Sequence, residues 1–129
     1  MKLAIFSTKG LVGGVLVESD EVGWLYRGQE RVGRIEVDWG GEDQEHIASV
    51  IIAGSCAATV VLDRYGQSAG KVTRQYDTLG EIRPEGGGVI GIYRGQQRVG
   101  YLQGQGLSSK HMILFGGAGA AVLLNLTSA

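Results

Sequence analysis

The sequence predicts a single all-β domain made of repeated short hairpins. The chain has 23 glycines but 1 proline among 129 residues, and the glycines lie among Val, Ile and Leu, unlike the composition of disordered linkers. One phrase also occurs twice, as YRGQERVGRI at 26–35 and as YRGQQRVGYL at 93–102. Frequent glycines combined with an internal repeat indicate short strands joined by tight turns.

The repeated phrase has weaker copies elsewhere in the chain. Tyr26 aligns with Tyr93, and the segments 5–16, 61–72 and 76–82 keep parts of the same order: an apolar or aromatic residue, a polar stretch with glycine, a small apolar residue and a second glycine. We expect the first glycine to supply the positive φ of a turn; these are Gly10, Gly28, Gly66 and Gly95. The second glycine is expected at a bulge or where another backbone comes close; these are Gly13, Gly33, Gly70 and Gly100.

The length predicts one domain with its own core. We expect four to six hairpin units, wound side by side as a short solenoid, roll or sandwich. The predicted units lie near 3–18, 22–39, 47–62, 61–74, 75–83 and 89–104. The apolar tail, 112–126, is expected to close one end of the β structure as a short helix or a strand, and its alanines and leucines favour the helix.

The charges balance overall but not along the chain. Twelve Lys and Arg face 13 Asp and Glu, which argues against a strongly basic nucleic-acid binder. Residues 1–45 hold nine of the acids and five of the bases, whereas no acid follows Glu85. We therefore expect the two ends of the chain to carry opposite charge, an arrangement that suits head-to-tail contact between copies.

The arginines of the repeated phrase are the candidate ligand-binding residues. Repeated arginines beside tyrosines can hold a phosphate or a sugar acid, and the second copy is the better candidate because Gln97 replaces the acidic Glu30 of the first. The alternative, which we favour, is that these polar side chains decorate exposed turns. The candidate residues are Tyr93, Arg94, Arg98, Tyr101, Arg27 and Arg31.

The remaining aromatic residues leave two interpretations open. Trp24 and Trp39, together with Tyr26, Tyr93 and Tyr101, could form a platform for stacking sugars or bases. Large aromatics in a small β domain usually belong to the core, and we favour that placement.

No catalytic or metal-binding pattern is complete in the sequence. Cys56 is a lone cysteine among alanines, typical of a small buried apolar group. His46 and His111 do not have metal-ligand spacing, and Asp38, Asp43 and Asp77 do not form a calcium loop. We expect no metal, no cofactor and no enzymatic activity, with a Cys56- or His111-dependent enzyme as the third hypothesis.

Two further motifs match known patterns incompletely. FGGAGAAV at 115–122 has two glycines of a dinucleotide fingerprint but Val122 at the third place, so packing is the expected role. Asn125 starts a glycosylation sequence, which matters only for a secreted chain. The first ten residues lack a signal-peptide core, a single cysteine gives no disulfide framework, and the tail is too short to span a membrane. A cytoplasmic location is therefore expected.

The segment YDTLGEI resembles one unit of the YD-type hairpin repeats of large bacterial shell-forming toxins and surface proteins, through Tyr76, Asp77, Gly80 and Ile82. More broadly, the chain looks like small bacterial hairpin-repeat proteins of unknown function. The resemblance implies a hairpin architecture and no catalytic residues.

These observations lead to a structural or protein-interaction module without catalysis as the first functional hypothesis, with another copy of itself or another protein as its partner. The alternative is a small binding domain for an anionic or carbohydrate ligand.

Overall fold

A computed structural model describes residues 1–41, 44–62, 69–74 and 77–127. Strands make up 62% of it, which confirms the predicted all-β class. The strands are β1 (Lys2–Ser7), β2 (Gly10–Val17), β3 (Val22–Arg27), β4 (Glu30–Asp38), β5 (His46–Ile52), β6 (Ser55–Leu62), β7 (Gly70–Arg74), β8 (Asp77–Gly86), β9 (Val89–Arg94) and β10 (Gln97–Gly104).

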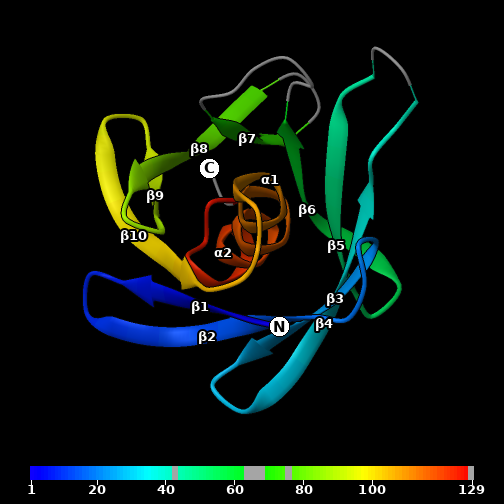
Figure 1. The fold of residues 1–129 in the computed structure, drawn as a ribbon, viewed down its shortest axis with the longest axis horizontal. Helices are drawn as coiled ribbons and strands as arrows, with labels where there is room; N and C mark the ends of the chain where they lie inside the picture. Colours follow the sequence, from blue (N-terminus) through cyan, green and yellow to red (C-terminus); the bar gives the residue numbers. More distant parts are fainter. Residues whose placement is uncertain (42–43, 63–68, 75–76, 128–129) are drawn as a thin grey trace.

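The ten strands form a closed antiparallel barrel (Figure 1). Each strand pairs with its neighbours in sequence, and β10 closes the barrel on β1 in a register that runs from Leu3 opposite Gly104 to Ser7 opposite Gly100. The closed barrel is more specific than the predicted solenoid, roll or sandwich of side-by-side hairpins. Among the described residues, closure leaves no unpaired edge strand, so hairpins that would be marginal alone are paired on both sides.

Five hairpins, numbered 1 to 5 in chain order, make up the barrel: β1–β2, β3–β4, β5–β6, β7–β8 and β9–β10. Each has a register shift at the same place in its returning strand. The extra residue of the bulge is Val12, Val32, Ala57, Leu79 or Val99, followed by Gly13, Gly33, Ala58, Gly80 or Gly100. The repeated phrase thus encodes a bulged hairpin, and bulges increase the strand curvature that a closed barrel needs.

The predicted turn and bulge glycines are confirmed at most positions. Gly10, Gly28 and Gly95 have positive φ, while Gly66 lies outside the described residues. Gly13, Gly33 and Gly100 each follow a bulge. Gly70 instead begins β7, where an added Cβ would overlap Ile113 of the central helix.

After β6, the described residues up to Gly86 form one hairpin, β7–β8. Residues 61–62 end β6, and Gly70–Arg74 of β7 pairs with Asp77–Gly86 of β8. The segments 61–74 and 75–83 therefore contribute the end of one hairpin and most of the next. Tyr76, which carries part of the YD-type resemblance, lies outside the described residues.

The apolar tail forms a helix that fills the inside of the barrel (Figure 1). It consists of α1 (Ser109–His111), a wider π-helical turn η1 (Met112–Gly116) and α2 (Gly117–Leu123), together called the central helix. The helix was predicted, but its expected place at one end of the β structure was wrong. Its apolar side chains, including Ile113, Leu114 and Phe115, are buried against the inward residues of the strands, and each such burial contributes about 1.5–3 kcal/mol.

Glycines in FGGAGAAV let the helix fit inside the strands. A Cβ at Gly116 would lie 2.6 Å from Leu102 Cδ1, and one at Gly119 would lie 2.9 Å from Leu25 Cδ1. The packing role predicted for this motif is therefore confirmed.

The barrel has two different ends. The turns within the five hairpins lie at one end, the tip end, because consecutive antiparallel strands alternate in direction. The connections between hairpins lie at the other end, the loop end. The central helix follows β10 at the loop end and finishes at the tip end, where Leu124 faces Gly100 and Leu126 faces Gly80.

Candidate functional site

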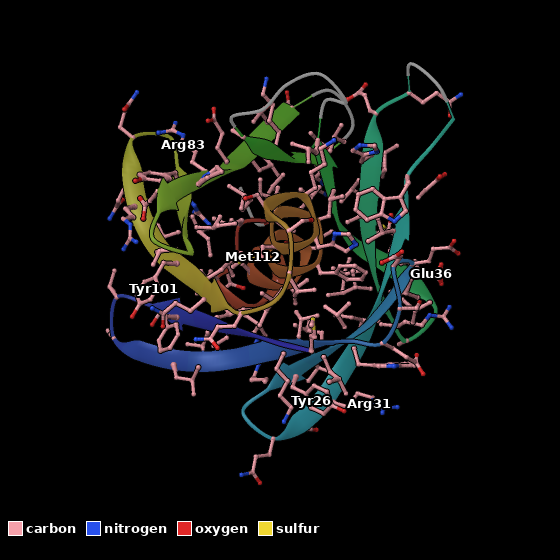
Figure 2. All side chains as sticks on the ribbon, in the orientation of Figure 1. Tyr26, Arg31, Glu36, Arg83, Tyr101 and Met112 are labelled. Carbon is pink, nitrogen blue, oxygen red and sulfur yellow. The ribbon has the colours of Figure 1, made fainter. Side chains whose placement is uncertain are left out.

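The six predicted ligand-binding residues do not form one site. Tyr93, Arg98 and Tyr101 lie together on the outer face of hairpins 4 and 5, and Arg31 lies on the outer face of hairpin 2. Arg94 and Arg27 lie at the tip end, each at the last position of its strand. Figure 2 shows Tyr26 with Arg31 on one part of the outer surface and Arg83 and Tyr101 on another.

Glu85, which the sequence analysis did not select, is the centre of the hairpin 5 cluster. Its carboxylate accepts hydrogen bonds from Arg98 Nη2 at 2.5 Å, from Arg98 Nε at 3.1 Å and from the Tyr93 hydroxyl at 2.5 Å. The hydrogen bonds from Arg98 and then Tyr93 lower the pKa of Glu85 below its ordinary value. The same carboxylate raises the pKa of Tyr93 and of Arg98. Arg98 is therefore already bound to an anionic group of its own chain.

Gly91 makes room for this carboxylate. A Cβ at Gly91 would overlap the carboxylate of Glu85, so the missing side chain on β9 lets Glu85 reach from β8 across to β10. Aromatic contacts surround the cluster: Arg83 lies over the Tyr93 ring at 4.5 Å, and Phe6 stacks on Tyr101 at 4.7 Å. A glycine at an outward-facing position of a strand is the sequence signal that could have indicated the space filled by Glu85.

On hairpin 2 the arginine of the repeated phrase, Arg31, contacts aromatic rings, whereas on hairpin 5 the corresponding Arg98 contacts a carboxylate. The Arg31 guanidinium lies 4.3 Å from the centre of the Trp24 ring and 5.9 Å from that of Tyr26. Trp24 Nε1 donates to Glu18 at 3.0 Å, which fixes the ring on the surface. Cation–π contacts of this kind at exposed sites contribute about 0.5–1 kcal/mol.

Arg94 and Arg27 differ although they occupy the same place in the repeated phrase. Arg94 Nη2 donates to the backbone carbonyl of Asn125, just beyond the central helix. The Arg27 side chain is exposed and has no hydrogen bond, ion pair or ring contact among the described residues. Arg94 thus holds the end of the central helix in place, whereas Arg27 is exposed to solvent.

The charged side chains are sorted along the barrel axis. Each connection is counted with the two strand residues on either side, and the Arg98–Glu85 ion pair is left out of both counts because its two charges lie together. Among the described residues the tip end carries five bases and two acids, a net +3 (5 − 2). The same count at the loop end, with Lys110 of α1, gives five acids and three bases, a net −2 (3 − 5). The tip-end bases are Lys9, Arg27, Arg31, Arg74 and Arg94, and the loop-end acids are Glu18, Asp20, Glu21, Asp38 and Glu45.

The remaining charges pair on the barrel waist. Arg34 lies 2.5 Å from Glu36, and Arg83 lies 2.9 Å from Glu81. The sequence analysis expected opposite charge at the two ends of the chain; in the fold the separation runs between the two ends of the barrel. Up-and-down strands cause this difference, since every hairpin brings its turn to the same end.

The favoured core placement is wrong for Trp24, for the three tyrosines and for Cys56, whereas Trp39 does pack against the core. Trp24, Tyr26, Tyr93 and Tyr101 are half-buried on the outer surface, where strand alternation points them away from Leu25, Ile92 and other core residues. Trp39 is half-buried and packs against the core. Cys56 is exposed near the tip of hairpin 3, with its Sγ 3.5 Å from Thr59 Oγ1.

The histidines lie at the loop end, where they join connections to the central helix. His111 Nε2 lies 3.0 Å from Asp20 Oδ1, and its Nδ1 lies 2.6 Å from Ser108 Oγ. Ser108 also accepts the backbone N–H of His111 at 3.2 Å, which makes it the N-cap of α1. Buried His46 contacts the Trp39 carbonyl at 2.8 Å through Nδ1. This hydrogen-bonded group ties two connections to the start of the central helix.

A shallow groove of about 790 Å³ crosses the outer face of β1, β2 and β3. Its floor is low because Ala4 and Gly14 pair there, and a Cβ at Gly14 would lie 2.5 Å from the Leu3 carbonyl oxygen. Leu11, 66% exposed, stands on its rim. The close approach of β1 and β2 explains this depression.

Within the described part of the chain, no cluster of three His, Cys, Asp or Glu could hold a metal ion. Among the same residues, no helix combines the length and the apolar character needed to cross a membrane.

Comparisons of the chain with protein-family models, with curated proteins and with solved structures found no match. The similarity to YD-type repeats remains a prediction from the motif.

Proposed function

We propose that this chain is a non-catalytic interaction module that binds an acidic protein surface through its tip end. The observation that carries the proposal is the group of five bases against two acids at that end among the described residues, the Arg98–Glu85 pair left out. Surfaces of one sign raise the local concentration of partners of the other sign and accelerate their association.

The tip-end bases are available for such contacts. Lys9, Arg27 and Arg74 are exposed, and their side chains have no hydrogen bond, ion pair or ring contact among the described residues. They belong to three different hairpins, 1, 2 and 4, so their charge is spread across the end of the barrel. A broad basic surface favours a macromolecular partner over a small anion, for which donors must converge on one point.

The hairpin 5 arginine is less suited to a small anionic ligand than the sequence analysis expected. Arg98 already donates both Nε and Nη2 to Glu85. A phosphate or carboxylate ligand would have to displace that carboxylate, and Glu85 would repel it.

The placement of Cys56 argues against the Cys56-dependent enzyme among the hypotheses. Cys56 lies toward the tip end, whereas His46 and His111 lie at the loop end, so neither histidine can act as a base for its thiol. At the loop end, Ser108 Oγ lies 2.6 Å from His111 Nδ1 and Asp20 lies 3.0 Å from His111 Nε2, and all three residues line one pocket. The role that we assign to Ser108 is the N-cap of α1, since its hydroxyl accepts the backbone N–H of His111.

Binding to labelled poly-L-glutamate tests the proposal, with affinity measured at low and high salt. The wild-type chain, despite its net charge of −1, is expected to bind at low salt and to release as salt rises. Replacing two uncommitted arginines, Arg27→Gln with Arg74→Gln, is expected to weaken binding at least about fivefold.

The matched control is Arg34→Gln with Arg83→Gln, which removes the same charge from the barrel waist and should leave binding nearly unchanged. Equal loss in both double variants would contradict a role for the tip end. Tighter binding to a DNA duplex than to polyglutamate would replace the acidic protein surface by nucleic acid.

A further inference from the structure

We infer that the acidic surface bound by the tip end is the loop end of a second copy of this chain, so that barrels stack head to tail. This inference rests on the proposed function and names its partner. Its basis is charge complementarity within one molecule: with the Arg98–Glu85 pair left out, the described residues give a net +3 (5 − 2) at the tip end and −2 (3 − 5) at the loop end.

The loop-end acids are positioned to meet a neighbour. Glu18, Asp20 and Glu21 lie together in the connection between hairpins 1 and 2, and Asp38 and Glu45 flank the next connection. All five are exposed. Asp20 has 84% of its side chain exposed even though it contacts His111. The described residues of these two connections thus place five exposed acids at the loop end.

The two ends also match in extent, because the same ten strands terminate at both. In a stacked pair the tips of one barrel would face the connections of the next. The contact joins different surfaces of the two copies and is therefore heterologous, leaving a free basic end and a free acidic end for further copies. An open chain of barrels follows, unless a rotation between copies closes it into a ring.

The contact is expected to depend on salt. Its charges are exposed, and at physiological ionic strength exposed charges interact over about 8 Å. Stacking should therefore appear at low salt and increase with protein concentration.

Charge reversal at each end, with light scattering behind a sizing column, tests the inference. The tip variant is Arg27→Glu with Arg74→Glu, and the loop variant is Glu21→Lys with Glu45→Lys. Each reverses two exposed side chains that have no hydrogen bond, ion pair or ring contact among the described residues. The wild type is expected to exceed the monomer mass at low salt, and each variant alone is expected to remain a monomer at a protein concentration at least about tenfold higher.

Mixing the two variants gives the decisive measurement. By the same count the tip end of the first variant carries −1 (3 − 4) and the loop end of the second carries +2 (−2 + 4), so the mixture is expected to associate again at low salt. A waist variant, Arg34→Glu with Arg83→Glu, changes the net charge as much as the tip variant does and should associate like the wild type.

The outcomes separate the two proposals. A wild-type monomer at low salt that still binds polyglutamate would overturn the stacking and leave the proposed function standing. A chain that neither stacks nor binds polyglutamate would overturn both. Association of the wild type without recovery in the mixture would show that copies meet through other surfaces.

Discussion

Hairpins 2 and 5 contain nearly the same ten-residue sequence, yet their arginines make different contacts. In hairpin 5, Arg98 is bound by Glu85 and Arg94 is hydrogen-bonded to the end of the central helix. In hairpin 2, Arg31 lies over Trp24, and the Arg27 side chain has no hydrogen bond, ion pair or ring contact among the described residues. The phrase specifies a turn and a bulge, whereas neighbouring strands decide what its side chains contact.

One substitution between the hairpins accounts for much of the difference. Trp24 of hairpin 2 aligns with Gly91 of hairpin 5 when Tyr26 is placed on Tyr93. The indole gives Arg31 an aromatic face, while the glycine opens the space that Glu85 fills. A repeat can therefore keep its backbone while a single outward position selects between an aromatic and a carboxylate partner for the same arginine.

The largest expected difference between the two hairpins lies at the bulge glycines. A Cβ at Gly100 would overlap the Phe6 carbonyl, and it would also lie 2.8 Å from Leu124 Cδ1. At Gly33 the nearest atoms are Ile52 Cγ1 at 2.9 Å and the Ile51 carbonyl oxygen at 3.0 Å, a less severe overlap. Gly100→Ala should lower the free energy of unfolding by about 3 kcal/mol and Gly33→Ala by about 1 kcal/mol. Urea unfolding measures both; equal losses would mean that the barrel adjusts at both bulges alike.

The second difference concerns the paired arginines at the tip end. Arg94→Ala removes a charged donor from the Asn125 carbonyl and should cost about 1 kcal/mol of stability. Arg27→Ala should change stability by less than about 0.5 kcal/mol, because the side chain is exposed and without a described contact. Thermal unfolding of the two variants checks this, and a larger loss for Arg27→Ala would show that Arg94 does not hold the helix end.

The sequence predicted the local structure of this molecule well. Gly28 and Gly95 indicated the turns, and Val32–Gly33 and Val99–Gly100 occur at bulges as expected for glycine inside a returning strand. Such features depend on residues close in the chain. The closure of β10 on β1, between residues about 100 positions apart, depends on the summed twist of all strands, and no short motif records it.

The location of the tail and of the candidate residues shows the same limit. An apolar, glycine-rich helix fits a capping position as well as the inside of a barrel, until the strand number sets the space available. Glu85 was missed because its partner Arg98 lies 13 residues away on another strand. Arg98 was predicted to bind a phosphate or a sugar acid, and the carboxylate that it contacts in the structure belongs to Glu85 of the protein itself.

The next difference between the two hairpins is that the Glu85–Arg98 ion pair makes the contribution of hairpin 5 to stability depend on pH. The pKa of Glu85 in the folded chain lies below its ordinary value of 4.5. Its ion pair therefore stabilises the fold fully above about pH 4.5, and the contribution disappears as pH falls through the folded pKa. Glu85→Gln should lower stability at pH 7 by less than about 1 kcal/mol, because both partners are partly exposed.

The contribution of Glu85 should vanish in strong acid, where the wild type and Glu85→Gln are expected to unfold alike. Urea unfolding at pH 7 and at pH 2 measures the change. In an Arg98→Gln background, Glu85→Gln should have a smaller effect at pH 7. An effect of Glu85→Gln that grows as pH falls would contradict the lowered pKa.

The smallest expected effect is the cation–π contact of hairpin 2. Arg31→Ala exposes one face of Trp24 to water and should cost about 0.5 kcal/mol, with a shift of tryptophan emission to longer wavelength. Trp39, which contacts His46 and His111 at the loop end, should contribute the same emission before and after. In a Trp24→Phe background the shift should therefore disappear. If it persists, Arg31→Ala has altered the barrel beyond hairpin 2, and the independence of the two arginine clusters would be lost.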